Sequence, residues 1–341
     1  MNMNRLVLSE AETAETQLLV DDLAARYDTV EDTAFLREAA VCAHELPRRV
    51  RLHLTNFKLL EPVSALCVIS GYPIDDETIG DTPTHWKHRV RPSRTLREEM
   101  LLVLCGSLLG EPIAWATQQD GYLVHDILPI KGHENEQLGS GSEQLLWWHV
   151  EDAFHPCRGD YLGMLCLRNP DRVATTFACL ENIQLGQQLR AKLFEPHYTI
   201  RPDESHLKKN KSEVREIDRL LEASYREIER MNTRPDPIPI FQGDSESPYF
   251  RLDPYFMDRA QDPEAQEAFE GLCAAIEHNL EDLILTGGDF CFIDNFKAVH
   301  GRRPFKARYD GKDRWLKRIN VARDLRKSRS ARLMADSRVI Y

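Results

Sequence analysis

The sequence has neither a long apolar run nor an excess of positive charge. Its first residues lack the apolar core of a signal peptide, and no apolar stretch is long enough to cross a bilayer. The formal net charge is −11, which argues against sequence-independent nucleic-acid binding because that needs clustered basic residues. We therefore expect no membrane or nucleic-acid partner, and the acidic balance is compatible with a small cationic substrate.

Closely paired cysteines are also missing. The chain has 8 cysteines, none of them in a C-x-x-C pair, and most stand in apolar runs such as Leu165-Cys166-Leu167. Buried, reduced thiols are the ordinary interpretation of that pattern. The sequence therefore predicts a protein of the reducing cytoplasm.

The first third of the chain is predicted to be mostly helical, and the rest mostly β. Capping-box patterns (Ser-x-x-Glu and Thr-x-x-Glu) at residues 9 and 95 begin two of the helices. Helices are expected over 9–27, 35–43 and 95–110. Short strands are expected over 65–71, 113–117, 124–128, 163–167, 174–180, 238–241, 250–252, 289–293 and 315–321.

Many short strands with helices before and between them predict an α+β fold, mostly β with flanking helices, built on a sandwich or barrel. The jelly roll is the member of that group that often holds a metal between its sheets. The 341 residues contain no internal repeat, and we expect one domain over 1–341. Its mostly helical part would cover 1–112 and its jelly-roll core 113–325.

One segment, 203–237, differs from its surroundings. It is rich in charged residues, contains a plausible helix over 213–231 and ends in Arg-Pro-Asp-Pro. The composition by itself favours a solvated surface helix. A second interpretation is an active-site lid inserted between two strands.

His149-x-Glu151 is a candidate metal-binding pattern. On an extended chain, residues two apart point to the same face, so an imidazole and a carboxylate would lie together. A third ligand from downstream, His300, would complete a 2-His-1-carboxylate set, which holds ferrous iron and leaves positions open for other molecules. A single H-x-E pattern is common by chance, and its alternative is a strand with one buried histidine and a surface glutamate.

Two arginines follow His300 and lie on or next to a predicted strand. On a strand, Arg314 and Arg318 share one face with Leu316 between them. Inward-facing guanidiniums are costly without anionic partners, and each is suited to bidentate carboxylate binding. The segment therefore predicts either a site for two different carboxylates or two surface arginines on an edge strand.

Together these motifs resemble those of the iron(II)/2-oxoglutarate-dependent oxygenases of the clavaminate-synthase-like group. The resemblance is closest to the L-arginine hydroxylases of viomycin (capreomycidine) and streptothricin-type antibiotic biosynthesis. It extends with similar spacing over nearly the whole chain, in the stretches 43–49, 115–121, 128–132, 148–154, 167–170, 201–207 and 292–323.

The resemblance implies a double-stranded β-helix (jelly-roll) core with an inserted helical lid, and three non-protein reactants: Fe(II), 2-oxoglutarate and O2. It implies hydroxylation of free L-arginine at C3, or at C3 and C4. The implied iron ligands are His149, Glu151 and His300. Arg314 and Thr175 would hold the distal carboxylate of 2-oxoglutarate.

The resemblance also implies a set of residues that bind the amino acid. Arg318 would hold its α-carboxylate, while Gln118 and the second oxygen of Glu151 would contact its α-amino group. Asp203 and Ser205 would belong to the lid. Asp253 would pair with the guanidinium.

Tyr255 is a departure from the viomycin-type pattern, in which two acids one residue apart clamp the guanidinium. Here Asp253 is present and Tyr255 takes the place of the second acid. A single carboxylate can still bind a guanidinium bidentately, and a tyrosine can stack on it. The alternative for Asp253 is an ordinary turn residue before proline.

Several alternatives follow for the function. The chain is a hydroxylase of arginine, a hydroxylase of lysine or homoarginine, or a 4,5-desaturase of arginine. A protein of another class, which binds an amino acid on the same fold without catalysis, is a further alternative. The oligomeric state is left open between a monomer and a homodimer.

Overall fold

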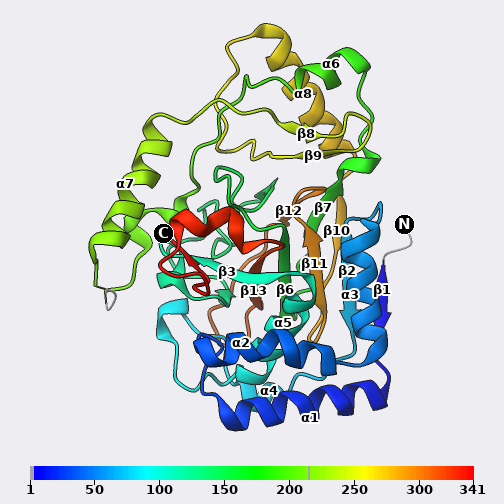
Figure 1. The fold of residues 1–341 in the computed structure, drawn as a ribbon, viewed down its shortest axis with the longest axis vertical. Helices are drawn as coiled ribbons and strands as arrows, with labels where there is room; N and C mark the ends of the chain where they lie inside the picture. The colour runs from blue at the N-terminus through cyan, green and yellow to red at the C-terminus, as the bar shows by residue number, and fades with distance from the viewer. Residues whose placement is uncertain (1–3, 214–215) are drawn as a thin grey trace.

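The computed structural model describes residues 4–213 and 216–341. Two β-sheets form its centre (Figure 1). The larger sheet has the strand order β1-β2-β11-β6-β13-β3-β14, with β4 also paired to β13, and the smaller sheet has the order β10-β7-β12-β5. A separate hairpin pairs β8 with β9.

The strands of the larger sheet are β1 (Arg5–Val7), β2 (Leu66–Ser70), β3 (Glu111–Trp115), β4 (His125–Ile127), β6 (Tyr161–Arg168), β11 (Phe290–Asp294), β13 (Trp315–Ala322) and β14 (Val339–Ile340). Those of the smaller sheet are β5 (Leu146–His149), β7 (Thr175–Cys179), β10 (Glu281–Leu283) and β12 (Ala298–Arg302). The hairpin consists of β8 (Phe241–Gly243) and β9 (Pro248–Phe250).

The α-helices are α1 (Glu10–Arg26), α2 (Thr33–Cys42), α3 (Arg48–Leu60), α4 (Asp76–Ile79), α5 (Leu96–Leu109), α6 (Gln187–Lys192), α7 (Arg219–Thr233) and α8 (Pro263–His278).

The two sheets pack face to face, because one apolar cluster joins side chains of both. Leu162 and Cys166 of β6 pack in it with Phe177 of β7 and Ala298 of β12. The other face of the larger sheet is covered by α1, α2, α3 and α5, which share a second cluster with Phe292 and other residues of that sheet. Helices α6 and α8 lie with the β8–β9 hairpin at the opposite end of the molecule (Figure 1). The predicted mostly β fold with flanking helices and a jelly-roll core is confirmed.

The predicted boundaries differ from the structure where local capping differs. Helix α1 starts at the predicted capping box of Ser9 and Glu12. Helix α5 does start after Thr95, but the Thr95 hydroxyl donates to a Glu99 carboxylate oxygen at 2.8 Å and does not cap the helix. Helix α7 starts later than the predicted residue 213, because Asp218 caps it; residues 214–215 lie outside the described residues.

The predicted strand over 238–241 is largely wrong. Ile238 forms only an isolated bridge with Tyr198, and β8 begins at Phe241. Strand β12, which holds His300, was not among the predicted strands. None of the helices described in 4–213 and 216–341 is both long and apolar enough to cross a membrane.

Candidate active site

His149 and His300 meet because their strands are neighbours in the smaller sheet. Strand β5 ends at His149, and the antiparallel register of β5 and β12 places His149 directly opposite His300. Their ring centroids are 4.6 Å apart. The Nδ1 atom of His149 is 2.8 Å from the Trp147 carbonyl oxygen, which leaves its Nε2 atom directed into the pocket. Such a contact fixes the orientation and tautomer of a histidine that ligates a metal.

Glu151 lies in a turn after β5, and from there its side chain reaches the two histidines. The strand parity expected from the sequence therefore does not explain why Glu151 and His149 meet. Its peptide N–H donates to Asn295 Oδ1 at 2.8 Å, and Asn295 Nδ2 donates to the Glu151 carbonyl oxygen at 3.0 Å. The next residue, Asp152, has a left-handed backbone with φ of 52°. One buried asparagine therefore holds the turn that follows β5 through both backbone polar groups of Glu151.

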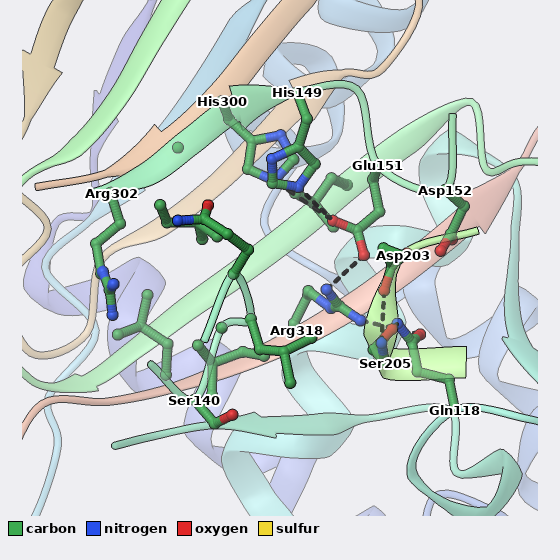
Figure 2. A pocket seen from close by; sticks show the side chains of 18 of the residues that line it. Gln118, Ser140, His149, Glu151, Asp152, Asp203, Ser205, His300, Arg302 and Arg318 are labelled. Carbon is green, nitrogen blue, oxygen red and sulfur yellow. Dashed lines mark hydrogen bonds and ion pairs between the residues drawn. The ribbon is translucent and has the colours of Figure 1, made fainter. Parts of the chain in front are cut away.

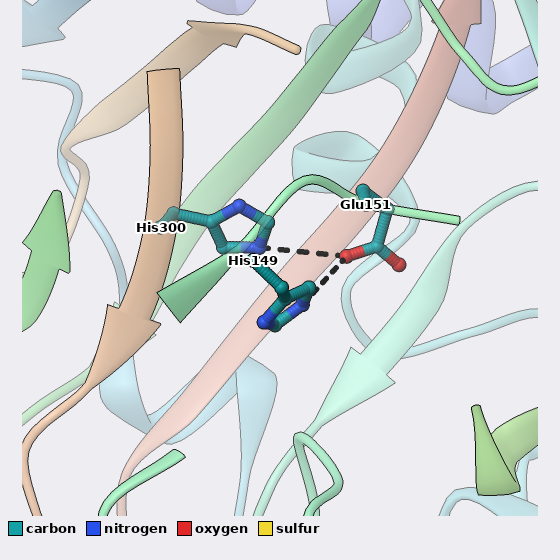
Figure 3. Close-up of side chains that lie close together, drawn as sticks. All are labelled: His149, Glu151 and His300. Atoms are coloured by element: carbon teal, nitrogen blue, oxygen red, sulfur yellow. Dashed lines mark ion pairs between the residues drawn. The ribbon is translucent and has the colours of Figure 1, made fainter. Parts of the chain in front are cut away.

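The three side chains form a set that fits one metal ion (Figure 3). The Oε2 atom of Glu151 lies 3.7 Å from His149 Nε2 and 3.4 Å from His300 Nε2. One ligand atom from each residue lies within 4.8 Å of the other two. Two imidazoles and one carboxylate with an open side are the donors typical of non-haem iron.

The second oxygen of Glu151 faces Arg318 (Figure 2). The Arg318 guanidinium forms an ion pair with Glu151 Oε1 and donates to Gln118 Oε1 at 3.0 Å. It also contacts His125 Nδ1 at 2.9 Å, so that nitrogen accepts. Burial opposes ionisation of Glu151, but Arg318 and the hydrogen bonds from His149 and His300 outweigh it and hold the Glu151 pKa well below its usual range.

Asp203 and Ser205 lie at the edge of the same pocket. Asp203 caps the short helical turn Glu204–His206 by accepting the Ser205 N–H at 2.8 Å. The Ser205 hydroxyl accepts from Gln118 Nε2 at 2.7 Å. A continuous chain of polar contacts therefore runs from Glu151 through Arg318 and Gln118 to Ser205 (Figure 2).

Arg314 and Thr175 lie together in the lining of the same pocket. Arg314 precedes β13, is buried, and its Nη2 atom is 3.4 Å from Thr175 Oγ1. Burial lowers the pKa of Arg314 to about 10, and its Nε atom is buried without a hydrogen-bond partner. A buried guanidinium in this condition is suited to receive an anion from the pocket.

Arg302 is a second buried arginine beside this part of the pocket, and the sequence reasoning did not single it out. It ends β12, opposite Thr175 in the sheet register. Its guanidinium donates to the carbonyl oxygens of Gly141 and Gln144. Arg302 therefore holds the 141–144 loop against the sheet.

Asp253 and Tyr255 lie in the pocket lining and differ in exposure. Asp253 is buried, and burial raises its pKa to about 7, with a smaller opposite contribution from His149. The Tyr255 side chain is 53% exposed, and its ring lies 6.5 Å from that of Trp147, which is 39% exposed. The pocket lining thus combines one buried carboxylate with two partly exposed aromatic rings.

All the site residues expected from the sequence therefore lie around one pocket. Residues that the sequence reasoning missed are Asn295, Arg302, His206 and Asp152. The signal for Asp152 and His206 was their position inside the motifs that hold Glu151 and Ser205. Nothing in the sequence indicated that these two side chains meet.

Two facing sheets, antiparallel apart from the edge pairs β1–β2 and β3–β14, with this donor set and a buried arginine in one pocket, define a non-haem iron, 2-oxoglutarate-dependent oxygenase. The comparisons with known proteins agree. Residues 107–320 match the model of the taurine catabolism dioxygenase TauD, TfdA family. The chain belongs to this dioxygenase family.

Two relatives match over the full length of the chain. One is an enduracididine β-hydroxylase of Streptomyces hygroscopicus, 45% identical over 99% of this chain and 100% of the relative. The other is an L-ornithine/L-arginine 3-hydroxylase of Catenulispora acidiphila, 46% identical over 99% of this chain and 100% of the relative.

The solved structures of the non-haem iron oxygenase OrfP are similar over the same length. The complex of OrfP with Fe, succinate and (3S)-hydroxy-L-Arg has a TM-score of 0.94 and 46% identity, and 99% of each chain is covered. The complex with Fe and α-ketoglutaric acid has a TM-score of 0.88 and 44% identity, and covers 99% of this chain and 100% of OrfP.

Proposed function

We propose that this enzyme hydroxylates free L-arginine at C3, or at C3 and C4, with Fe(II), 2-oxoglutarate and O2. The observation that carries the proposal is the pairing of two features in one pocket. A 2-His-1-carboxylate set lies beside Arg318, and a buried carboxylate, Asp253, lines the same cavity. A pocket with a cation and an anion of this kind suits an amino acid with a positively charged side chain.

His149, Glu151 and His300 would hold the iron, which their convergent nitrogen and oxygen atoms fit. When bound, iron with 2-oxoglutarate and O2 supplies the oxidising power that replaces a C–H bond by a C–OH bond, and succinate and CO2 are released. The protein's own contribution is to hold both organic molecules in place. It thereby determines which carbon of the substrate is oxidised.

Arg314 and Thr175 would hold the distal carboxylate of 2-oxoglutarate. Arg314 is buried and forms a long 3.4 Å contact with Thr175, so a bidentate carboxylate would give it a charged partner. A threonine hydroxyl beside it can donate to the same anion. The α-ketoglutaric acid and succinate present in the OrfP structures support 2-oxoglutarate as the cosubstrate.

Arg318 would hold the α-carboxylate of the amino acid, and Gln118 and Glu151 Oε1 its α-amino group. Arg318 already contacts both of these acceptors, so the three groups lie close enough to bind the two ends of one α-amino acid. Asp203 and Ser205 would close the pocket from the 203–237 segment, which we propose acts as a lid. Lid closure would exclude water from the oxidation.

Asp253 would pair with the side-chain guanidinium. Its burial disfavours the charged form, and an incoming cation offsets that cost. The names of the relatives, an enduracididine β-hydroxylase and an L-ornithine/L-arginine 3-hydroxylase, support a basic amino acid that is hydroxylated at C3. They also support a place in specialised-metabolite biosynthesis.

We infer that the enzyme works in the cytoplasm. All eight cysteines are free thiols, and six of them are buried. This state is typical of a reducing compartment.

A mass-spectrometric assay tests the proposed function. The protein is incubated under air with ferrous iron, 2-oxoglutarate, ascorbate and a panel of arginine, ornithine, lysine, homoarginine and enduracididine. We expect arginine to gain the mass of one oxygen atom, or of two, with matching succinate. Loss of two hydrogens would indicate desaturation, and modification of another amino acid alone would overturn the choice of arginine.

Succinate without any modified amino acid would leave the oxygenase class intact and refute the substrate. Absence of succinate and of any modified amino acid, with protein that binds iron, would favour the non-catalytic binding protein.

A further inference from the structure

Asp152, the residue after Glu151, is the centre of a buried hydrogen-bond network. One of its carboxylate oxygens accepts from Trp115 Nε1 at 2.6 Å and from Asn320 Nδ2 at 3.0 Å. The other lies 3.0 Å from His206 Nε2. These partners come from β3, from β13 and from the turn Glu204–His206. The turn that carries Glu151 is thereby tied to three separate parts of the chain.

His206 uses both of its ring nitrogens. Its Nε2 atom faces Asp152, and its Nδ1 atom is 2.8 Å from the hydroxyl of Thr117. The side chain is completely buried, and its ring packs edge-on against Trp115 at 5.8 Å and Phe154 at 4.9 Å. A side chain held at both ring nitrogens and packed against two aromatic rings has one orientation.

His206 also helps to join the segment that carries Ser205 to the segment that carries Gln118. Ser205 bonds to Gln118 while His206 bonds to Thr117, so two consecutive residues of one segment are joined to two consecutive residues of another. Asp203, three residues before His206, lines the pocket. His206 is thus the buried attachment point of the segment that presents Asp203 and Ser205.

A second metal at Asp152, Asp203 and His206 is a competing interpretation, because these residues also form a compact group. The contacts argue against it. Both Asp152 oxygens already face N–H donors, and Thr117 occupies the other histidine nitrogen. A hydrogen-bond network accounts for the whole group.

We propose that His206 is a positioning residue that couples amino-acid binding to the metal site. It clamps the segment with Asp203 and Ser205 onto the turn that carries Glu151, so that the substrate side of the pocket is positioned against the iron ligand. The turn itself is also held by Asn295, Trp115 and Asn320, so loss of the clamp leaves the iron ligands and Arg314 in place but loosens the side of the pocket that holds the substrate. A larger share of the 2-oxoglutarate would then be consumed without hydroxylation of the amino acid. The inference rests on the proposed function, because it assumes an amino acid beside Ser205.

The test compares His206→Leu, His206→Gln and a control, His155→Leu. Leucine fills much of the ring volume without either hydrogen bond, whereas glutamine keeps an amide donor toward Asp152. His155 packs on the same Trp115 ring, with centroids 4.5 Å apart, but its Nδ1 atom accepts from Cys157 N–H. It therefore reports the effect of changing a neighbouring histidine outside the network.

We expect His206→Leu to raise the KM for the amino acid about tenfold, the effect of losing one hydrogen bond to a buried charged group. The ratio of succinate to hydroxylated product should rise, while substrate-free succinate formation stays near its original rate. In the metal-free protein, amides of residues 203–207 should exchange with deuterium faster. His206→Gln should recover part of each change, and His155→Leu should show none of them.

Equal changes in His206→Leu and His155→Leu, or an unchanged succinate ratio with His206→Leu, would overturn the inference. If His206→Leu does not fold, Thr117→Val removes only the Nδ1 contact and should change the same quantities in the same direction by less. An unchanged succinate ratio in that variant would also count against the clamp. Failure of the unmodified enzyme to hydroxylate any amino acid would refute the proposed function instead.

Discussion

Two parts of the pocket lining are built differently. In the first part, Arg318 contacts both Glu151 and Gln118, Glu151 is tied to Asn295, and Gln118 is tied to Ser205. In the second part, the buried Asp253 lines the pocket together with the partly exposed rings of Trp147 and Tyr255. The preformed first part suits a reaction that is the same for many substrates, and the more exposed second part suits the recognition of one side chain. Substitutions in the two parts should therefore affect the reaction and the recognition of the side chain separately.

The largest effect is expected at the proposed iron ligands. His149→Ala should remove both turnover and stoichiometric iron binding, because an imidazole cannot be replaced by water without losing the geometry of the site. Elemental analysis would measure the bound iron, and mass spectrometry of the succinate formed would measure turnover. His197→Ala, which changes a half-exposed histidine paired with Glu195, is the control. Full iron occupancy and turnover in His149→Ala would contradict the ligand assignment.

A smaller and more selective effect is expected at Arg314. Replacing it by leucine removes a charged hydrogen-bond donor, so the KM for 2-oxoglutarate should rise roughly 10- to 100-fold, as for loss of about 1.5–3 kcal/mol. Iron binding should persist. Thr175→Val should raise the same KM by less, since the threonine contributes one neutral donor. An increase in the KM for the amino acid alone would mean that Arg314 binds the amino acid and not 2-oxoglutarate.

The pH dependence of substrate binding should follow Asp253. Burial raises its pKa to about 7, and only the ionised form attracts a guanidinium. The KM for arginine should therefore rise as the pH falls below 7, by up to about tenfold per pH unit, and should be flat above it. Bound cation lowers this pKa, so kcat should change at lower pH than kcat/KM. An identical profile in Asp253→Asn would show that another group is responsible.

The smallest effect is expected at Tyr255. Tyr255→Asp supplies a second carboxylate at a position that is 53% exposed, so it should lower the KM for arginine only about two- to fivefold, as for an exposed ion pair of about 0.5–1 kcal/mol. Tyr255→Phe keeps the ring and is the matched control. Steady-state kinetics with arginine and with lysine would measure both. A hundredfold change in either variant would make Tyr255 a principal determinant of specificity.

Much of the site could be predicted from the sequence because its chemistry is recorded in residue type and spacing. His149, Glu151, His300 and Arg314 were chosen for their donor atoms, and the structure brings them around one pocket. Strand parity, however, does not place Glu151 in the site. Glu151 reaches the pocket from a turn held by Asn295, 144 residues away in the chain, and a local parity rule contains no such information.

The parts that the sequence did not reveal depend on long-range pairing. The β5–β12 register places His149 opposite His300, yet β12 lacks the alternating pattern of a typical strand because it is buried along its length. The His206–Asp152 pair joins residues from two separate motifs. Contacts of this kind depend on how distant strands pair, and local sequence patterns do not reveal them.

The separation of reaction from recognition is tested most directly by two rates measured on Asp253→Asn. One is the succinate formed without any amino acid, and the other is the hydroxyarginine formed at subsaturating arginine. We expect the first rate to stay close to that of the unmodified enzyme and the second to fall at least tenfold, as for loss of a charged hydrogen bond. Equal losses of both rates, or undiminished hydroxyarginine, would contradict this separation.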